Sequence, residues 1–210
     1  MNKRNFLLSW AAVAGLSALA EAQDGTFRTW FETPDTVLAG ETFEVRMWVS
    51  FESDLFPPHS DGGFTFSDVS FEVSGDLDAF AEISPLTSGL GGILSFGTPD
   101  GPWLRNASTW QHPINQLFVS ANPVTVLVFE VTTAADSIGT LDIDIRPGFF
   151  NNDIPLLEWY IGGNDGDIYV NTNDPNIALI ATPASVRVIP APGVGVLLAL
   201  AGHGALRRRR

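Results

Sequence analysis

The sequence predicts an all-β domain, a single antiparallel β-sandwich or jelly roll. Its central part alternates apolar and polar residues in short segments, which is typical of half-buried strands. Gly, Pro, Asn and Asp cluster between these segments and favour turns. Apart from the two chain ends, no long stretch repeats apolar residues at helical spacing. With 15 Phe and 6 Trp in 210 residues, one well-filled core is expected.

The first predicted strands lie between residues 26 and 50. Thr26 to Glu32 is a short, aromatic-rich segment, and Glu41 to Ser50 alternates without interruption. One face of the second segment is apolar: Phe43, Val45, Met47 and Val49. The other face carries Thr42, Glu44 and Arg46. Residues 51–63 contain two prolines and are expected to form a loop.

A change of phase marks the next strand region. Apolar residues occupy even positions up to Phe66 and odd positions from Val69 to Val73. We therefore expect a bulge, or a break between two strands, at Ser67 and Asp68.

Six further strands are predicted in the second half of the domain. Val124 to Val131 is apolar on both faces and predicts a central strand that is covered on two sides. Leu141 to Ile145 alternates again. Shorter strands are expected at four places: Glu158 to Ile161, Asp167 to Val170, Ile177 to Ala181 and Ser185 to Ile189.

A long loop is expected at residues 98–113, and it contains Trp103 and Trp110. Together with Trp159, these side chains are candidates to stack on sugar rings, as aromatic platforms do in carbohydrate-binding domains. The alternative is that they pack as a small satellite core beneath the loop. Trp30 and Trp48 are placed in strands.

A cluster of oxygen ligands follows the strand predicted at Glu158 to Ile161. Asn164, Asp165 and Asp167 lie on a glycine-rich segment, and calcium prefers such ligands. The spacing differs from that of an EF-hand loop and there is no closing Glu. The alternative is a tight turn built on Asn-Asp-Gly. Calcium is the one cofactor for which the sequence offers a candidate site.

Charge and composition exclude several function classes. Between Gln23 and Ile189 there are 23 acidic residues and five arginines, a net charge of about −18 against −13 for the whole chain. Such a surface repels nucleic acid, so no nucleic-acid partner is expected. There is no cysteine, which excludes disulfides and thiolate chemistry. His59 and His112 lie in proline-flanked loops without a nucleophile motif, so no enzymatic activity is expected.

The first 22 residues have the pattern of a secretory signal peptide. Lys3 and Arg4 precede an apolar segment from Phe6 to Ala20, and small residues then offer a cleavage site. We expect a signal helix that is removed on export, leaving residues 23–189 as one acidic domain. A retained membrane anchor is the alternative.

Residues 190–210 have three parts: Pro190-Ala191-Pro192, a short apolar run from Val194 to Leu206, and four arginines, Arg207, Arg208, Arg209 and Arg210. This order resembles the PEP-CTERM sorting signal of Gram-negative bacteria, although Ala191 stands where that family usually has Glu. The resemblance implies a transmembrane-like helix in the inner membrane, processing by an exosortase-like enzyme, and a place among proteins that accompany exopolysaccharide. A plain tail anchor is the alternative.

A fainter resemblance concerns the domain itself. Val37 to Val45, Val126 to Val131 and the turn into Leu141 are similar in layout to cohesin-like and carbohydrate-binding sandwich domains. The sequence therefore predicts an exported, non-enzymatic protein of the cell surface or extracellular matrix, associated with exopolysaccharide. The alternative is a carbohydrate-binding module, with or without calcium.

Overall fold

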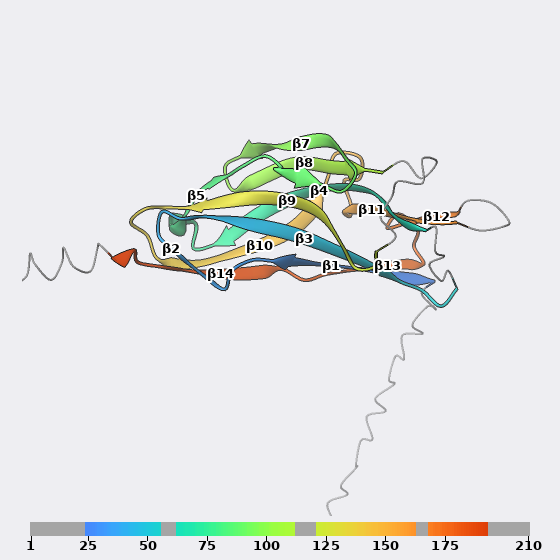
Figure 1. The fold of residues 1–210 in the computed structure, drawn as a ribbon, viewed down its shortest axis with the longest axis horizontal. Helices are drawn as coiled ribbons and strands as arrows, with labels where there is room; N and C mark the ends of the chain where they lie inside the picture. The colour runs from blue at the N-terminus through green and yellow to red at the C-terminus, as the bar shows by residue number, and fades with distance from the viewer. Residues whose placement is uncertain (1–23, 56–61, 112–120, 163–167, 193–210) are drawn as a thin grey trace, which may run out of the picture.

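The computed structural model describes residues 24–55, 62–111, 121–162 and 168–192, and these form two β-sheets that pack face to face. Figure 1 shows most strands running along the long axis of the domain, with the first described residues near one end and the last near the other. The only described helix of more than one residue is a single 3-10 turn, η1, at Leu77–Ala79. The all-β prediction is confirmed.

The first sheet has six strands in the order β13-β1-β3-β9-β5, and the two-residue strand β6 also pairs with β9. Its strands are β1 (Gly25–Glu32), β3 (Thr42–Glu52), β5 (Phe80–Ile83), β6 (Ser88–Gly89), β9 (Val124–Thr133) and β13 (Ile177–Ala181).

The second sheet has eight strands, and its main path is β12-β11-β4-β10-β14-β2. β8 pairs with β4 and carries β7 as its outer neighbour. The strands are β2 (Thr36–Leu38), β4 (Gly63–Gly75), β7 (Gly92–Asp100), β8 (Trp103–Trp110), β10 (Gly139–Pro147), β11 (Leu156–Ile161), β12 (Ile168–Asn171) and β14 (Ala184–Ile189).

The core lies between the sheets and is rich in aromatic side chains. Every second residue of β3 points into it, and Val45, Met47 and Val49 have no exposed surface. Phe71 of the second sheet packs against Phe129 of the first in a tilted arrangement, with ring centroids 4.4 Å apart. Alternation therefore predicted correctly which face of β3 is buried.

The expected change of phase is a bulge within one continuous strand. β4 runs from Gly63 to Gly75, and its pairing with β11 skips Thr65. Phe64 before the bulge and Val69 after it both reach the core, with no exposed surface. The irregularity lies a little earlier than the sequence indicates.

Two expectations about the sheets were wrong. The expected loop at residues 98–113 is largely a hairpin of β7 and β8, because Gly101 adopts a φ of 57° and lets the chain reverse. The sandwich is also not purely antiparallel, since β1 pairs parallel with β13 and β14 pairs parallel with β2. The short strands β2, β5 and β6 were not predicted.

The signal and sorting segments lie almost entirely outside the described residues. This applies to residues 1–23 and to residues 193–210, so the two terminal helices stay predictions. In the part of the chain that the structure describes, no helix is long and apolar enough to cross a membrane.

Candidate functional site

A pair of tryptophans lies on the outer face of the six-stranded sheet. Trp30 of β1 and Trp48 of β3 are direct partners in the antiparallel register. Residues at the alternate positions of the same strands, such as Phe27 and Met47, point to the core. The pleat therefore turns both indoles toward solvent, where each is partly exposed.

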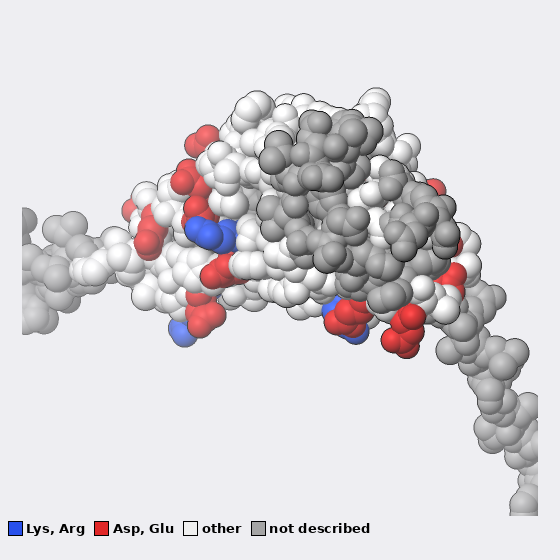
Figure 2. All heavy atoms as spheres, turned by 45° about the vertical axis from the view of Figure 1, so that its right-hand side comes forward, with Lys and Arg blue, Asp and Glu red and all other residues white. Residues whose placement is uncertain are grey.

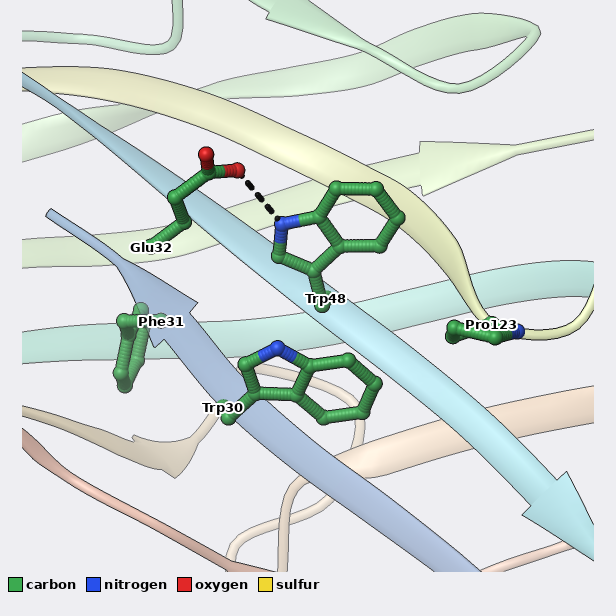
Figure 3. A pocket seen from close by; sticks show the side chains of 5 residues that line it. All are labelled: Trp30, Phe31, Glu32, Trp48 and Pro123. Carbon is green, nitrogen blue, oxygen red and sulfur yellow. Dashed lines mark hydrogen bonds between the residues drawn. The ribbon is translucent and has the colours of Figure 1, made fainter.

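The two indole rings are nearly parallel. Their centroids are 6.2 Å apart and the angle between their planes is 6°. Figure 3 shows both rings side by side, each presenting its face to the viewer. We call this pair the tryptophan platform. Two such rings offer an apolar aromatic area to solvent.

Glu32 fixes the orientation of one ring. Its Oε2 accepts a hydrogen bond of 3.0 Å from the Nε1–H of Trp48. Figure 3 shows the other carboxylate oxygen pointing away from the indole. The carboxylate thus holds the ring and keeps one oxygen directed at the surroundings.

Pro123 borders the platform on the side of β9. The neighbouring residue, Asn122, ties this segment to β3, since its Oδ1 accepts from the Phe51 N–H and its Nδ2 donates to the Phe51 carbonyl. Together with Trp30, Phe31, Glu32 and Trp48, Pro123 lines a shallow depression of about 420 Å³.

A second, more polar depression of about 480 Å³ adjoins the first through Glu32. It is lined by Glu32, Thr33, Pro34, Glu44 and Arg46. The Arg46 Nε lies 2.5 Å from Glu44 Oε1, so the two side chains form an ion pair on the outer face of β3. An elongated molecule lying here would meet aromatic faces first and then carboxylates and a guanidinium.

The surroundings of the site are acidic. Figure 2 shows many more acidic than basic side chains on the face that it draws. Four of the five described arginines pair with a carboxylate: Arg28, Arg46, Arg105 and Arg146. A neutral or cationic ligand is therefore favoured over an anionic one.

Trp103 and Trp110 do not form a common platform. They occupy the two ends of β8, so about 20 Å of strand separates them. Arg105 covers one face of Trp103, with its guanidinium carbon 4.7 Å from the ring centroid. Trp110 is 40% exposed at the other end of β8. Trp103 and Trp110 were expected in a loop and instead lie in a strand. Sugar binding by these two residues stays a prediction.

Trp159 is a core residue, so its proposed contact with sugar was wrong. The side chain has no exposed surface and stacks on Phe51, with ring centroids 5.8 Å apart. It lies on the inward face of β11, next to the bulge in β4.

Most other predicted site residues lie outside the described residues. This holds for Asn164, Asp165 and Asp167 and for Arg207 to Arg210. His59 and His112, for which no catalytic role was predicted, also lie outside them. Pro190, Ala191 and Pro192 are described and directly follow β14 at the surface. Within the described ranges, no three His, Cys, Asp or Glu side chains are grouped so that they could hold a metal ion.

The platform was missed although the sequence contains a signal for it. Trp48 follows Thr42, Glu44 and Arg46 at period 2, so it belongs to the polar face of its strand. An aromatic residue on a polar face has no core to fill and indicates a surface contact. The partner at Trp30 could not be identified, because the pairing register is not visible in the sequence.

Comparison with known proteins shows distant likeness in structure only. No family model matches the chain, and no curated protein matches its sequence. Among solved structures, a cohesin module from a family 33 glycoside hydrolase of Clostridium perfringens has a TM-score of 0.46 and 13% identity, covering 80% of this chain and 99% of the module. A chain of a type II cohesin–X–dockerin complex from Acetivibrio cellulolyticus has a TM-score of 0.45 and 9% identity. The match covers 79% of this chain and 99% of that one.

Proposed function

We propose that this chain is an exported, non-catalytic module of the cell envelope or matrix that binds polysaccharide through the tryptophan platform. The observation that carries the proposal is the cross-strand pair of Trp30 and Trp48, two nearly parallel and partly exposed indoles. The C–H face of a sugar ring is apolar and fits an indole face, while its hydroxyl groups need polar partners at the edge.

Polar side chains beside the platform support the proposal. Glu32 borders both depressions, and Glu44 and Arg46 line the second. Carboxylates and guanidinium groups make strong, planar hydrogen bonds with hydroxyl groups. The two adjoining depressions favour a chain of sugar units over a single one.

Export and sorting complete the proposal. The resemblance of residues 190–210 to a PEP-CTERM signal supports delivery to the envelope by an exosortase-like enzyme. Pro190 and Pro192 are exposed directly after the last strand, where a processing enzyme could reach them without opening the sandwich. Loose association with exopolysaccharide is then the expected outcome of release at the surface.

Affinity electrophoresis in gels that contain the exopolysaccharide of the producing cell tests the proposal. The wild-type chain should be retarded, and a Trp30→Ala/Trp48→Ala variant should bind roughly tenfold or more weakly, because each aromatic contact is worth about 1 kcal/mol. A Trp103→Ala/Trp110→Ala variant, with the same loss of two indoles, tests the alternative sugar site on β8 and should be retarded like the wild type. Equal retardation of wild type and the Trp30/Trp48 variant would contradict the proposal.

The same gels test the role of calcium. Retardation that persists in a chelator is expected for a site built on Trp30 and Trp48, since no cluster of metal ligands lies among the described residues that line either depression. If retardation needs calcium and disappears in Asp165→Asn/Asp167→Asn, the predicted calcium cluster carries the binding instead.

A further inference from the structure

The outer face of the second sheet has a pocket with a buried acid beneath it. The pocket has a volume of about 370 Å³ and lies between the β7–β8 hairpin and the turn after β10. Asp68 of β4 forms part of its lining and is only 1% exposed. The tryptophan platform is on the other sheet, so the two sites face opposite sides of the sandwich.

The carboxylate of Asp68 is incompletely satisfied. Its Oδ2 accepts a hydrogen bond of 2.5 Å from the backbone N–H of Phe150. Its Oδ1 is buried and receives no hydrogen bond from the described residues. A buried carboxylate oxygen without a donor costs free energy that a ligand donor can recover.

No described arginine of the neighbouring strands is available to neutralise this acid. Arg105 of β8 pairs with Asp100, and Arg146 of β10 pairs with Glu72 and Asp144. Burial raises the pKa of Asp68, and this outweighs the lowering by the backbone N–H groups of Phe150 and Phe149. The negative charge under the pocket is therefore left without a cation from these strands.

Leu94, Phe149 and Phe150 give the pocket an apolar part, beside the polar lining residues Ser95, Asn106 and Ser108. Phe149 and Phe150 are 68% and 66% exposed and meet edge to face, with centroids 5.4 Å apart. Leu94 of β7 is 58% exposed on the opposite wall. Such walls suit a hydrocarbon stem, and aromatic faces attract a cationic head.

The backbone is distorted at the same place. Asn106 lines the pocket and has a φ of 55°, the only positive value among the described residues other than glycine. It lies in a bulge of β8, and its N–H donates to Ser70 Oγ at 3.1 Å. Bulges of this kind redirect a side chain, and here the redirected amide lines the pocket.

We propose that this pocket binds an alkylammonium or alkylguanidinium group, with the charged head above Asp68 and the stem between Leu94 and the two phenylalanines. Asn106 contributes a carbonyl oxygen as a second acceptor. A lysine or arginine side chain of a partner protein and a free polyamine share this chemistry.

The test titrates the full-length chain with small probes, followed by amide chemical shifts. The cationic probes are the Nα-acetyl methylamides of lysine and arginine, and spermidine. The neutral control is the corresponding norleucine derivative, which keeps the stem and lacks the charge. We expect saturable shifts at Phe149, Phe150 and Asn106 with the cationic probes, and at least about tenfold weaker binding of the norleucine derivative.

Three variants identify the acceptors. Asp68→Asn should weaken binding at least about tenfold, whereas Asp142→Asn, which removes one charge from the same sheet, should leave it unchanged. Asn106→Gly keeps the positive φ without strain and removes the amide, so it should weaken binding in a folded protein even if Asp68→Asn fails to fold.

The probes also separate the two sources of the cation. Tighter binding of the amino-acid derivatives points to a side chain of a partner protein, and tighter binding of spermidine points to a free polyamine. Equal binding of the norleucine derivative, binding that is unaffected by both Asp68→Asn and Asn106→Gly, or no saturable shift would overturn the proposal.

Discussion

Asp68 shows how a single residue can be costly to the fold and informative about function. Its carboxylate lies under the turn that follows β10, where the absence of a side chain at Gly148 allows close approach. A Cβ on Gly148 would stand 2.5 Å from Asp68 Oδ1. The site is therefore shaped around the acid, although burial opposes its ionisation.

The raised pKa of Asp68 predicts how stability changes with pH. The folded state holds the Asp68 proton more tightly than the unfolded state does. Ionisation of Asp68 therefore lowers the free energy of unfolding as the pH rises through the folded pKa, and acidification restores it. Each unit of increase in the pKa corresponds to about 1.4 kcal/mol. Asp68→Asn should therefore gain stability relative to wild type as the pH rises from about 4 to 7.

Urea unfolding at several pH values measures this difference. The side-chain amide that Asp68→Asn introduces keeps an oxygen that can still accept the Phe150 N–H while the charge is removed. Asp142→Asn controls for the removal of one negative charge from the same sheet. The opposite result, in which the wild type gains stability relative to Asp68→Asn as the pH rises, would contradict the prediction. It would mean that folding favours the ionised form of Asp68.

Tryptophan residues show the limit of prediction from residue type alone. Trp159 has a polar nitrogen and follows a loop-rich region, yet it is a core residue with no exposed surface. Trp48 lies in a well-predicted strand, and its place on the polar face was the informative feature. Which face of a strand a tryptophan belongs to is therefore a better guide than whether a loop is predicted near it.

At the scale of elements, the strands with clear alternation were predictable and those with turn residues were not. β3 and β10 alternate clearly, and their predicted ends lie within two residues of the observed ones. The β7–β8 hairpin contains Gly97, Pro99 and Gly101, which favour a loop when only the local sequence is considered. Pairing of β8 with β4 outweighs that local preference.

The last strand is predicted to be essential for folding. β14 pairs with both β10 and β2, and its Val186 and Val188 are at most 2% exposed. Without these two buried valines the fold loses about 3–6 kcal/mol of hydrophobic stabilisation. This loss is comparable to the whole free energy of unfolding of many domains.

Truncation tests this prediction with a matched pair of chains. A chain that ends at Pro190 should unfold cooperatively in urea, and one that ends at Thr182 should give no cooperative transition. The first chain controls for loss of residues 191–210. A cooperative transition of similar midpoint in both would contradict the role assigned to β14.

For the whole molecule, the fold separates the two faces on which we propose binding. One sheet presents the tryptophan platform, and the other presents the pocket above Asp68. The two ends of the described chain lie far apart along the long axis, as Figure 1 shows. A segment attached after Ile189 would thus hold the domain by one end and leave both faces accessible.

Neither face could be derived from the sequence, because each joins residues far apart in the chain. The platform needs the register of β1 on β3, and the Asp68 pocket needs β4, β7, β8 and the turn after β10. Composition did indicate the acidic character of the surface that surrounds them. Register and long-range pairing are set by the packing of the whole sandwich.

The central claim is that Trp30 and Trp48 contact polysaccharide, and the indole Nε1–H signals of the tryptophans test it most directly. On titration with exopolysaccharide fragments, the signals of Trp30 and Trp48 should shift in a saturable manner, while that of the buried Trp159 should stay unchanged. Saturable shifts confined to Trp103 or Trp110, or no shift of any tryptophan signal, would contradict the account.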